Sequence, residues 1–173
     1  MDGDDTQMYP AARVLDGIGE NWPGPWTARS RSLLLVQRLA RLVQENARIV
    51  LQPHGLGFTE FEVLCALRAA PPPHRLLPTA LYDAVLVSSG GLTKILKSLE
   101  AAGLITRPPS DGDGRTHPVE LTRKGALLSE AAMTEIVAVD AARLKSSGMA
   151  QADYEVLEDR LSGMVAAMEN PGR

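Results

Sequence analysis

The chain has 173 residues, 45% of them hydrophobic and 23% charged, with a formal net charge of −3. This composition can bury a core and is unlike that of a disordered chain. The single cysteine, Cys65, excludes an internal disulfide, and no apolar run approaches the ~20 residues of a membrane-spanning helix. Because the N-terminus also lacks a signal pattern, we expect a cytoplasmic protein without a membrane partner.

The charges are unevenly distributed along the chain. Six basic and three acidic residues lie between positions 29 and 74, and seven basic and five acidic residues between 75 and 125. Residues 1–28 and 126–173 each carry four more acidic than basic residues. A cationic surface in the middle of the chain is therefore compatible with the negative total, and nucleic acid stays open as a partner.

Two helices are predicted before residue 55, over 8–20 and 29–52. Apolar residues of the second repeat at helical spacing, and the adjacent Leu33 and Leu34 widen its apolar surface beyond one stripe. The linker between the helices holds prolines and two tryptophans, Trp22 among them. These tryptophans indicate packing against a core or a subunit interface, with the wall of a ligand site as the less favoured alternative.

A third helix is predicted from Thr59. Thr59 and Glu62 have the spacing of a capping box, in which each side chain bonds the backbone N–H of the other residue. Three prolines at 71–73 end this helix, and Pro78 suits the first turn of a short helix after them. Cys65 lies inside the third helix and is interpreted as a buried structural thiol, because a redox sensor needs an exposed thiolate.

The stretch from residue 88 to residue 121 suggests DNA binding. Leucines at helical spacing predict a helix that starts at a Ser88 or Ser89 cap and stops at Gly103. Two short apolar runs around a loop rich in Pro, Gly and Asp predict a two-stranded hairpin with Arg115 at its tip. The helix would enter the major groove and the hairpin an adjacent minor groove. The alternative is a solvated helix beside an ordinary surface loop.

Two more helices are predicted after the hairpin. Thr122 can cap the first, which runs to about residue 144, and the second spans about 151–168. With the helix over 29–52 they offer more apolar surface than one chain can cover, so we expect a homodimer formed by both chain ends. Two recognition helices one DNA turn apart (~34–36 Å) would read a palindromic operator.

These elements predict a mainly α-helical fold with a small β-hairpin wing. A winged helix-turn-helix region over 56–121 would bind DNA. A helical dimerisation region would combine 29–53 with 122–170, and an N-terminal arm with a short extra helix would occupy 1–28.

Two stretches, SSGGLTKILKSLEAAGLITR (88–107) and SDGDGRTHPVELTRKG (110–125), resemble the MarR (multiple antibiotic resistance regulator) family of transcription factors. The resemblance implies an obligate homodimer, usually a repressor, that is often released by a small aromatic or anionic ligand. It also implies that Arg115 enters the minor groove and that Asp113 orients it. Gly112 stands where the family often has a second arginine, so a weaker salt dependence is expected.

The predicted DNA contacts combine the polar face of the recognition helix with the wing. They are Ser88, Ser89, Gly90, Thr93, Lys94, Lys97, Arg115 and His117.

A narrower resemblance concerns the urate-responsive branch of the family. The extra N-terminal helix carries it, and it implies that Trp22, Glu62 and Lys94 bind a flat anion by stacking, hydrogen bonding and charge. Lys94 stands where this branch has arginine, which recognises anions differently. A capping role for Glu62 and a phosphate contact for Lys94 are the alternatives.

We expect neither an enzyme nor a cofactor or metal site. The three histidines, His54, His74 and His117, lie in predicted loops far apart in sequence, and the first two are interpreted as solvated. The sequence lacks a nucleophile elbow, a phosphate loop and a dinucleotide fingerprint. The remaining alternative to a DNA-binding regulator is a winged-helix module that binds protein without sequence-specific DNA binding.

Overall fold

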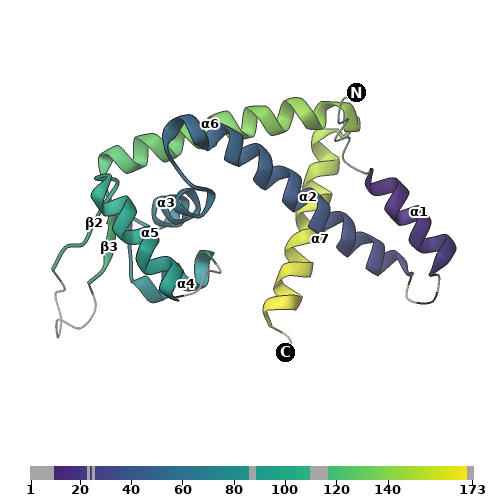
Figure 1. Ribbon diagram of the computed structural model, residues 1–173, viewed down its shortest axis with the longest axis horizontal. Coiled ribbons are helices and arrows are strands. Elements are labelled where there is room, and N and C mark those ends of the chain that lie inside the picture. Colours follow the sequence, from purple (N-terminus) through teal and green to yellow (C-terminus); the bar gives the residue numbers. More distant parts are fainter. Residues whose placement is uncertain (1–9, 23, 25, 86–88, 110–116, 171–173) are drawn as a thin grey trace, which may run out of the picture.

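The computed structural model describes residues 10–22, 24, 26–85, 89–109 and 117–170 (Figure 1). Its helices are α1 (Ala11–Asn21), α2 (Ala28–Leu51), α3 (Phe58–Ala69), α4 (Pro78–Val85), α5 (Ser89–Ala101), α6 (Arg123–Leu144) and α7 (Gln151–Glu169). The strands are β1 (Arg75–Leu76), β2 (Ile105–Thr106) and β3 (Val119–Leu121). The predicted mainly α-helical fold with a small wing is therefore confirmed.

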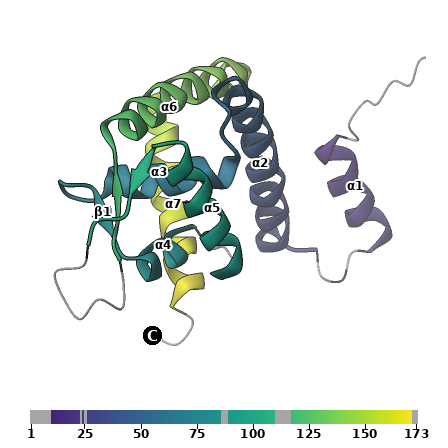
Figure 2. The ribbon, with the colours of Figure 1, turned by 60° about the vertical axis from the view of Figure 1, so that its left-hand side comes forward.

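The molecule has two ends, which α2 and α6 join. In Figures 1 and 2, α3, α4, α5 and the sheet gather at one end, and α1 lies on the far side of α2 from α5. α6 runs from the sheet to a 3₁₀ turn at Lys145–Ser147, from which α7 turns back. We call α3, α4, α5 and the sheet the winged end, and α1, the first half of α2 and α7 the outer end.

The core belongs to the winged end. Among the described residues, every buried apolar side chain lies between Ala47 and Ile136, and most of the largest come from α3, α4, α5 and the sheet. α1 and α7 contain no buried residue in the described chain. The described chain therefore has one core, and the outer end is packed only loosely against it.

The sheet contains the predicted hairpin and one strand more. β3 lies in the centre and pairs antiparallel with β1 and β2. On the β1 side, Arg75 donates to the Glu120 carboxylate through Nε at 2.9 Å and Nη2 at 2.6 Å. The two-residue β1 was not predicted, because it follows three prolines and is too short for a visible alternation.

Helix starts agree with the predictions in one case and differ in another. Thr122 caps α6, accepting the N–H of Gly125 at 3.0 Å, as predicted. The capping box at Thr59 is wrong: α3 starts earlier, and Glu60 accepts the N–H of Gly57 at 2.8 Å. Glycine at the N-cap leaves the N3 carboxylate to satisfy that backbone donor.

Three polar contacts tie α6 to the rest of the core. Asn46 donates to Asp140 at 2.8 Å, Arg68 to Glu130 at 2.7 Å, and His54 Nε2 lies 3.3 Å from Glu135. The interpretation of His54 and His74 as solvated residues is wrong, since a ring nitrogen of His74 also lies 2.7 Å from the Ala70 carbonyl oxygen. The side chains of His54 and His74 thus anchor the loops in which they lie.

Candidate nucleic-acid interface

The recognition helix α5 has one buried and one exposed face. Leu92, Leu96 and Leu99 enter the core. The other side exposes polar side chains at the same helical spacing, Thr93, Lys94 and Lys97 with Gly90 at the first turn. α5 starts at Ser89; the serine cap predicted at Ser88 or Ser89 is untested, because the Ser89 side chain and all of Ser88 lie outside the described residues.

Lys94 and Lys97 carry the positive charge of this face. Neither lysine makes a hydrogen bond or ion pair with any residue that the structure describes. Their ammonium groups are thus available to phosphates, which Lys binds as a compact, mobile charge.

The end of α5 is fixed as the sequence predicts. Gly103 adopts φ 69°, and the N–H of Leu104 donates to the Leu99 carbonyl at 2.9 Å. Lys124 adds a bond from Nζ to the Ala102 carbonyl at 2.8 Å. These contacts satisfy carbonyl groups that the helix leaves without partners.

The start of α6 holds the turn that leads from α5 into β2. The Thr122 hydroxyl lies 2.9 Å from the Gly103 carbonyl oxygen and 3.0 Å from that of Leu104. Gly125 packs so closely that a methyl group there would collide with the Leu104 carbonyl oxygen. The segment Thr122 to Gly125 therefore sets the position of α5 relative to α6.

The wing is described only at its base. Asp113 and Arg115 lie outside the described residues, whereas His117 is exposed just before β3. Arg107 is exposed directly after β2, on the side of the sheet that leads into the wing. Our prediction missed this cation, although its place directly after the first strand of the hairpin could have indicated it.

A hollow lies beside the recognition helix. Its lining comes from α4, α5 and the residue after β2: Pro78, Thr79, Tyr82, Asp83, Leu92, Thr93, Leu96 and Arg107. Leucines and the Tyr82 ring provide apolar walls, and the lining holds one cation, Arg107, and one acid, Asp83. This combination suits a small aromatic molecule whose anionic group lies beside Arg107.

The three residues of the narrower ligand prediction lie on separate elements. Trp22 follows α1 and is 66% exposed, Glu62 lies on α3, and Lys94 lies on α5. None of them lines the hollow beside α5 or the hollows at α1, α2 and α7. Burial raises the pKa of the Glu62 carboxyl.

Cys65 lies one helical turn from Glu62 on α3. Burial, and then the nearby Glu62 carboxylate, raise the pKa of its thiol to about 11. The thiol is therefore neutral at physiological pH, unlike that of a redox sensor, although the side chain is partly buried and not fully buried as predicted.

Within the described ranges, no group of three or more His, Cys, Asp or Glu side chains could hold a metal ion. Nor is any helix in those ranges long and apolar enough to cross a bilayer.

Comparison with known proteins identifies the family. A family model described as MarR family matches residues 54–116. The HTH-type transcriptional repressor Rv2887 of Mycobacterium tuberculosis is 31% identical over 107 residues, which cover 62% of this chain and 75% of that repressor. The chain belongs to the MarR family. Its relatives are named as transcriptional regulators; the urate-responsive branch is not confirmed.

A further relative and two solved structures are also similar to this chain. The regulator PecS of Dickeya dadantii is 29% identical over 102 residues, or 59% of this chain and 61% of PecS, so the chain spans less than two thirds of PecS. The structure of Rv2887 with salicylic acid matches at a TM-score of 0.60 and 27% identity, covering 76% of this chain and 93% of that one. AbsC from Streptomyces coelicolor matches at a TM-score of 0.68 and 22% identity, covering 84% and 98%.

Proposed function

We propose that this MarR-family chain forms a homodimer that represses transcription by binding a palindromic operator and is released by a small aromatic anion. The observation that carries the proposal is the exposed face of α5, where Lys94 and Lys97 stand without described partners above a buried leucine face. A helix whose apolar side is packed in the core and whose cationic side is exposed to solvent can enter the major groove of DNA.

The DNA contacts divide into two groups. On α5, Ser89, Gly90, Thr93 and Lys94 face the base edges, joined by Ser88 just before the helix, and Lys97 binds a phosphate. In the wing, Arg115 enters the minor groove with Asp113 as its orienting partner, and His117 and Arg107 contact the backbone nearby. In this proposal, residues 56–121 form the DNA-binding region.

Complementary surfaces of α2 and α7 support the homodimer. α2 carries five arginines and one acidic residue, whereas α7 carries five acidic residues and one arginine. Leu33, Val36 and Leu39 are exposed along one side of α2, and α7 exposes Leu157 and Val165. Packing α7 of one chain against α2 of the other buries these apolar stripes, and the opposite net charges of the two helices attract each other at longer range.

The hollow beside α5 is the proposed site of the effector. The related repressor Rv2887 is solved with salicylic acid and with p-aminosalicylic acid. In this chain the Arg107 guanidinium would bind a carboxylate while the ring packs on Leu92, Leu96 and Tyr82. Since Thr93 lines the same hollow, a bound effector would either compete with DNA for Thr93 or shift the face of α5 that contacts the bases.

Fluorescence anisotropy with the promoter DNA next to the gene tests the proposal over a range of salt concentrations. Arg115→Ala and Lys94→Ala should each weaken binding at least tenfold, because each removes a charge that meets phosphates or base edges. Lys97→Ala should weaken binding to all duplexes alike. It should also lower the slope of log affinity against log salt concentration by about 0.9 for each phosphate left without a cation. Lys145→Ala, on the turn before α7, is the matched control.

The same titration tests the effector. Salicylate should release the wild-type complex, and Arg107→Ala should abolish the response to salicylate. If all three cationic variants bind DNA like the wild type, the DNA-binding proposal is wrong, and the winged-helix protein-interaction module takes its place.

A further inference from the structure

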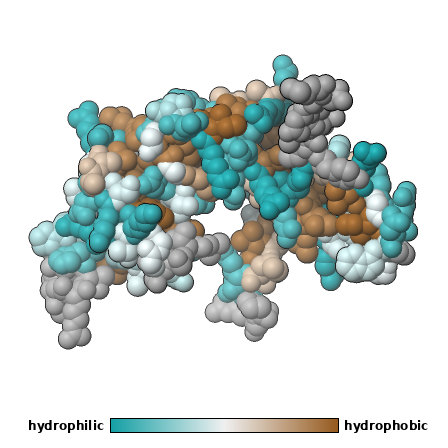
Figure 3. All heavy atoms as spheres, in the orientation of Figure 1, coloured by the Kyte–Doolittle hydropathy of each residue, from teal (hydrophilic) through white to brown (hydrophobic). Residues whose placement is uncertain are grey.

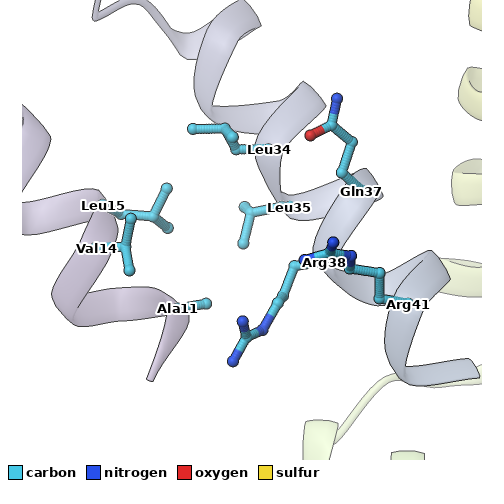
Figure 4. Close-up of a pocket in the computed structure, with 8 residues that line it drawn as sticks. All are labelled: Ala11, Val14, Leu15, Leu34, Leu35, Gln37, Arg38 and Arg41. Atoms are coloured by element: carbon cyan, nitrogen blue, oxygen red, sulfur yellow. The ribbon is translucent and has the colours of Figure 1, made fainter. Parts of the chain in front are cut away.

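A second hollow lies between α1 and α2, at the outer end. Three residues of α1 and five of α2 line it: Ala11, Val14, Leu15, Leu34, Leu35, Gln37, Arg38 and Arg41. Figure 4 shows the aliphatic side chains of the two helices facing each other across it, with the arginines on the α2 side. Its volume is about 190 Å³, slightly more than the ~150 Å³ of an engineered cavity that holds benzene.

The hollow is apolar at its walls and cationic at its edge. Figure 4 shows Arg38 extending from α2 toward the start of α1 near Ala11. Arg41, one turn further along α2, makes no hydrogen bond or ion pair with any residue that the structure describes. Aliphatic walls beside two guanidinium groups fit a molecule with a hydrocarbon body and one anionic head.

α1 itself needs additional contacts. It is only 11 residues long, contains Gly17 and Gly19, and its N-cap residue Pro10 provides no side-chain cap. Helices of this length are marginal without tertiary packing, and each glycine weakens them further. Because α1 buries no residue, the hollow marks the gap in its contact with α2. An occupant would contact both helices and hold them together.

The proposed dimer does not compete for this hollow. Helical spacing places Leu34, Arg38 and Arg41 on one side of α2, and Leu33 and Val36 on the other, with Leu35 and Leu39 at the border between the two sides. On the face drawn in Figure 3, an apolar patch covers the region of α1 and α2. α2 therefore carries two apolar sides, one toward a second copy and one toward α1.

We propose that the α1–α2 hollow binds an aliphatic monocarboxylate of about six to eight carbons. Its hydrocarbon chain packs on Val14, Leu15, Leu34 and Leu35, and its carboxylate pairs with Arg41, while Arg38 adds positive charge to the lining. Such a ligand is distinct from the effector proposed for the hollow beside α5, because the two sites share no residue. Binding docks α1 onto α2 and so couples the state of the N-terminal helix to the level of the carboxylate.

Tryptophan fluorescence provides the test without DNA. Trp26 lines an adjacent hollow together with Leu15 and Leu35, and the chain has two tryptophans, so Trp22→Phe leaves Trp26 as the reporter. Octanoate should change the Trp26 emission in a saturable way. Arg41→Ala should weaken binding at least tenfold, and uncharged octanamide should bind at least tenfold more weakly than octanoate. Arg48→Ala, on the same helix beside Glu45, is the control and should bind octanoate normally.

Hydrogen exchange provides the second readout. Octanoate should slow exchange of the amides of residues 11–21 in the wild type and in Arg48→Ala, but not in Arg41→Ala. The proposal is overturned if octanoate produces no saturable signal, or if octanamide or Arg41→Ala matches wild-type octanoate binding. Dissociation of the dimer by octanoate would also overturn it, by assigning the hollow to the second copy. Because neither assay contains DNA, these outcomes are separate from failure of the proposed function.

Discussion

α3 and α7 are both rich in apolar residues, yet they differ in what covers them. In α3, Val63, Leu64 and Leu67 are fully buried, because α2, α4, α5 and α6 pack around that helix. In α7, Val165 is 53% and Met168 77% exposed. The winged end therefore forms a closed core together with α2 and α6, whereas the outer end leaves apolar side chains uncovered in the described chain. Apolar content alone does not make a core; it needs neighbours on enough sides.

The largest expected effect concerns the winged end. Leu64→Ala should destabilise the protein by about 2–5 kcal/mol, because it removes packed methyl groups and leaves a cavity. Leu127→Ala, at an exposed leucine of α6, should change the free energy of unfolding by less than about 0.5 kcal/mol. Urea denaturation of both variants measures the difference. Equal losses would mean that the contrast between buried and exposed leucines is wrong.

A smaller effect is expected at the outer end, in association and not in folding. Leu161→Asp places a charge in the apolar stripe of α7, and it should raise the dissociation constant of the dimer at least tenfold, about 1.4 kcal/mol. Sedimentation velocity at micromolar concentrations checks it. Leu127→Asp, an equal change on exposed α6, is the control. An unchanged dimer in Leu161→Asp would exclude α7 from the interface.

The smallest effect is a pH dependence within α3. Burial raises the pKa of Glu62, so the folded protein binds its proton more tightly than the unfolded chain does. The stability that the protonated Glu62 carboxyl contributes is therefore lost as the pH rises from 4.5, its ordinary pKa, through its higher pKa in the folded protein. Glu62→Gln should therefore raise the melting temperature slightly at pH 7 and leave it unchanged at about pH 4. Glu100→Gln, at an exposed position of α5, should show no such difference.

Sequence reasoning predicted the elements whose signals are local. The leucine spacing of α5, the left-handed Gly103 and the Thr122 cap involve neighbours within one or two helical turns, and the structure contains all three. The start of α3 was misplaced because two acids, Glu60 and Glu62, compete for the same capping role. Spacing in the sequence does not decide which of the two carboxylates accepts the hydrogen bond from the unpaired backbone N–H at the helix start.

The candidate site was predicted less completely. The exposure of Lys94 and Lys97 follows from helical periodicity, and their contacts with DNA stay a prediction. Arg107 could have been noticed as a cation at the base of the wing, but its place in the lining of the hollow with α4 and α5 is not encoded by spacing in sequence. The grouping of Trp22 with Glu62 was implied by the resemblance to the urate-responsive branch; in the structure α1 and α3 lie on different sides of α2.

The close approach of Gly125 to Leu104 restricts how residues 78–121 can be exchanged between related proteins. A chimera that takes residues 78–121 from a relative would keep its own α6 only if the incoming β2 turn tolerates Thr122, Lys124 and Gly125 against its backbone. If the fusion point lies after Gly125, at an exposed position of α6, the turn at Leu104 and the segment Thr122 to Gly125 that packs on it come from the same parent protein. Engineered regulators with new operator specificity should therefore be spliced there.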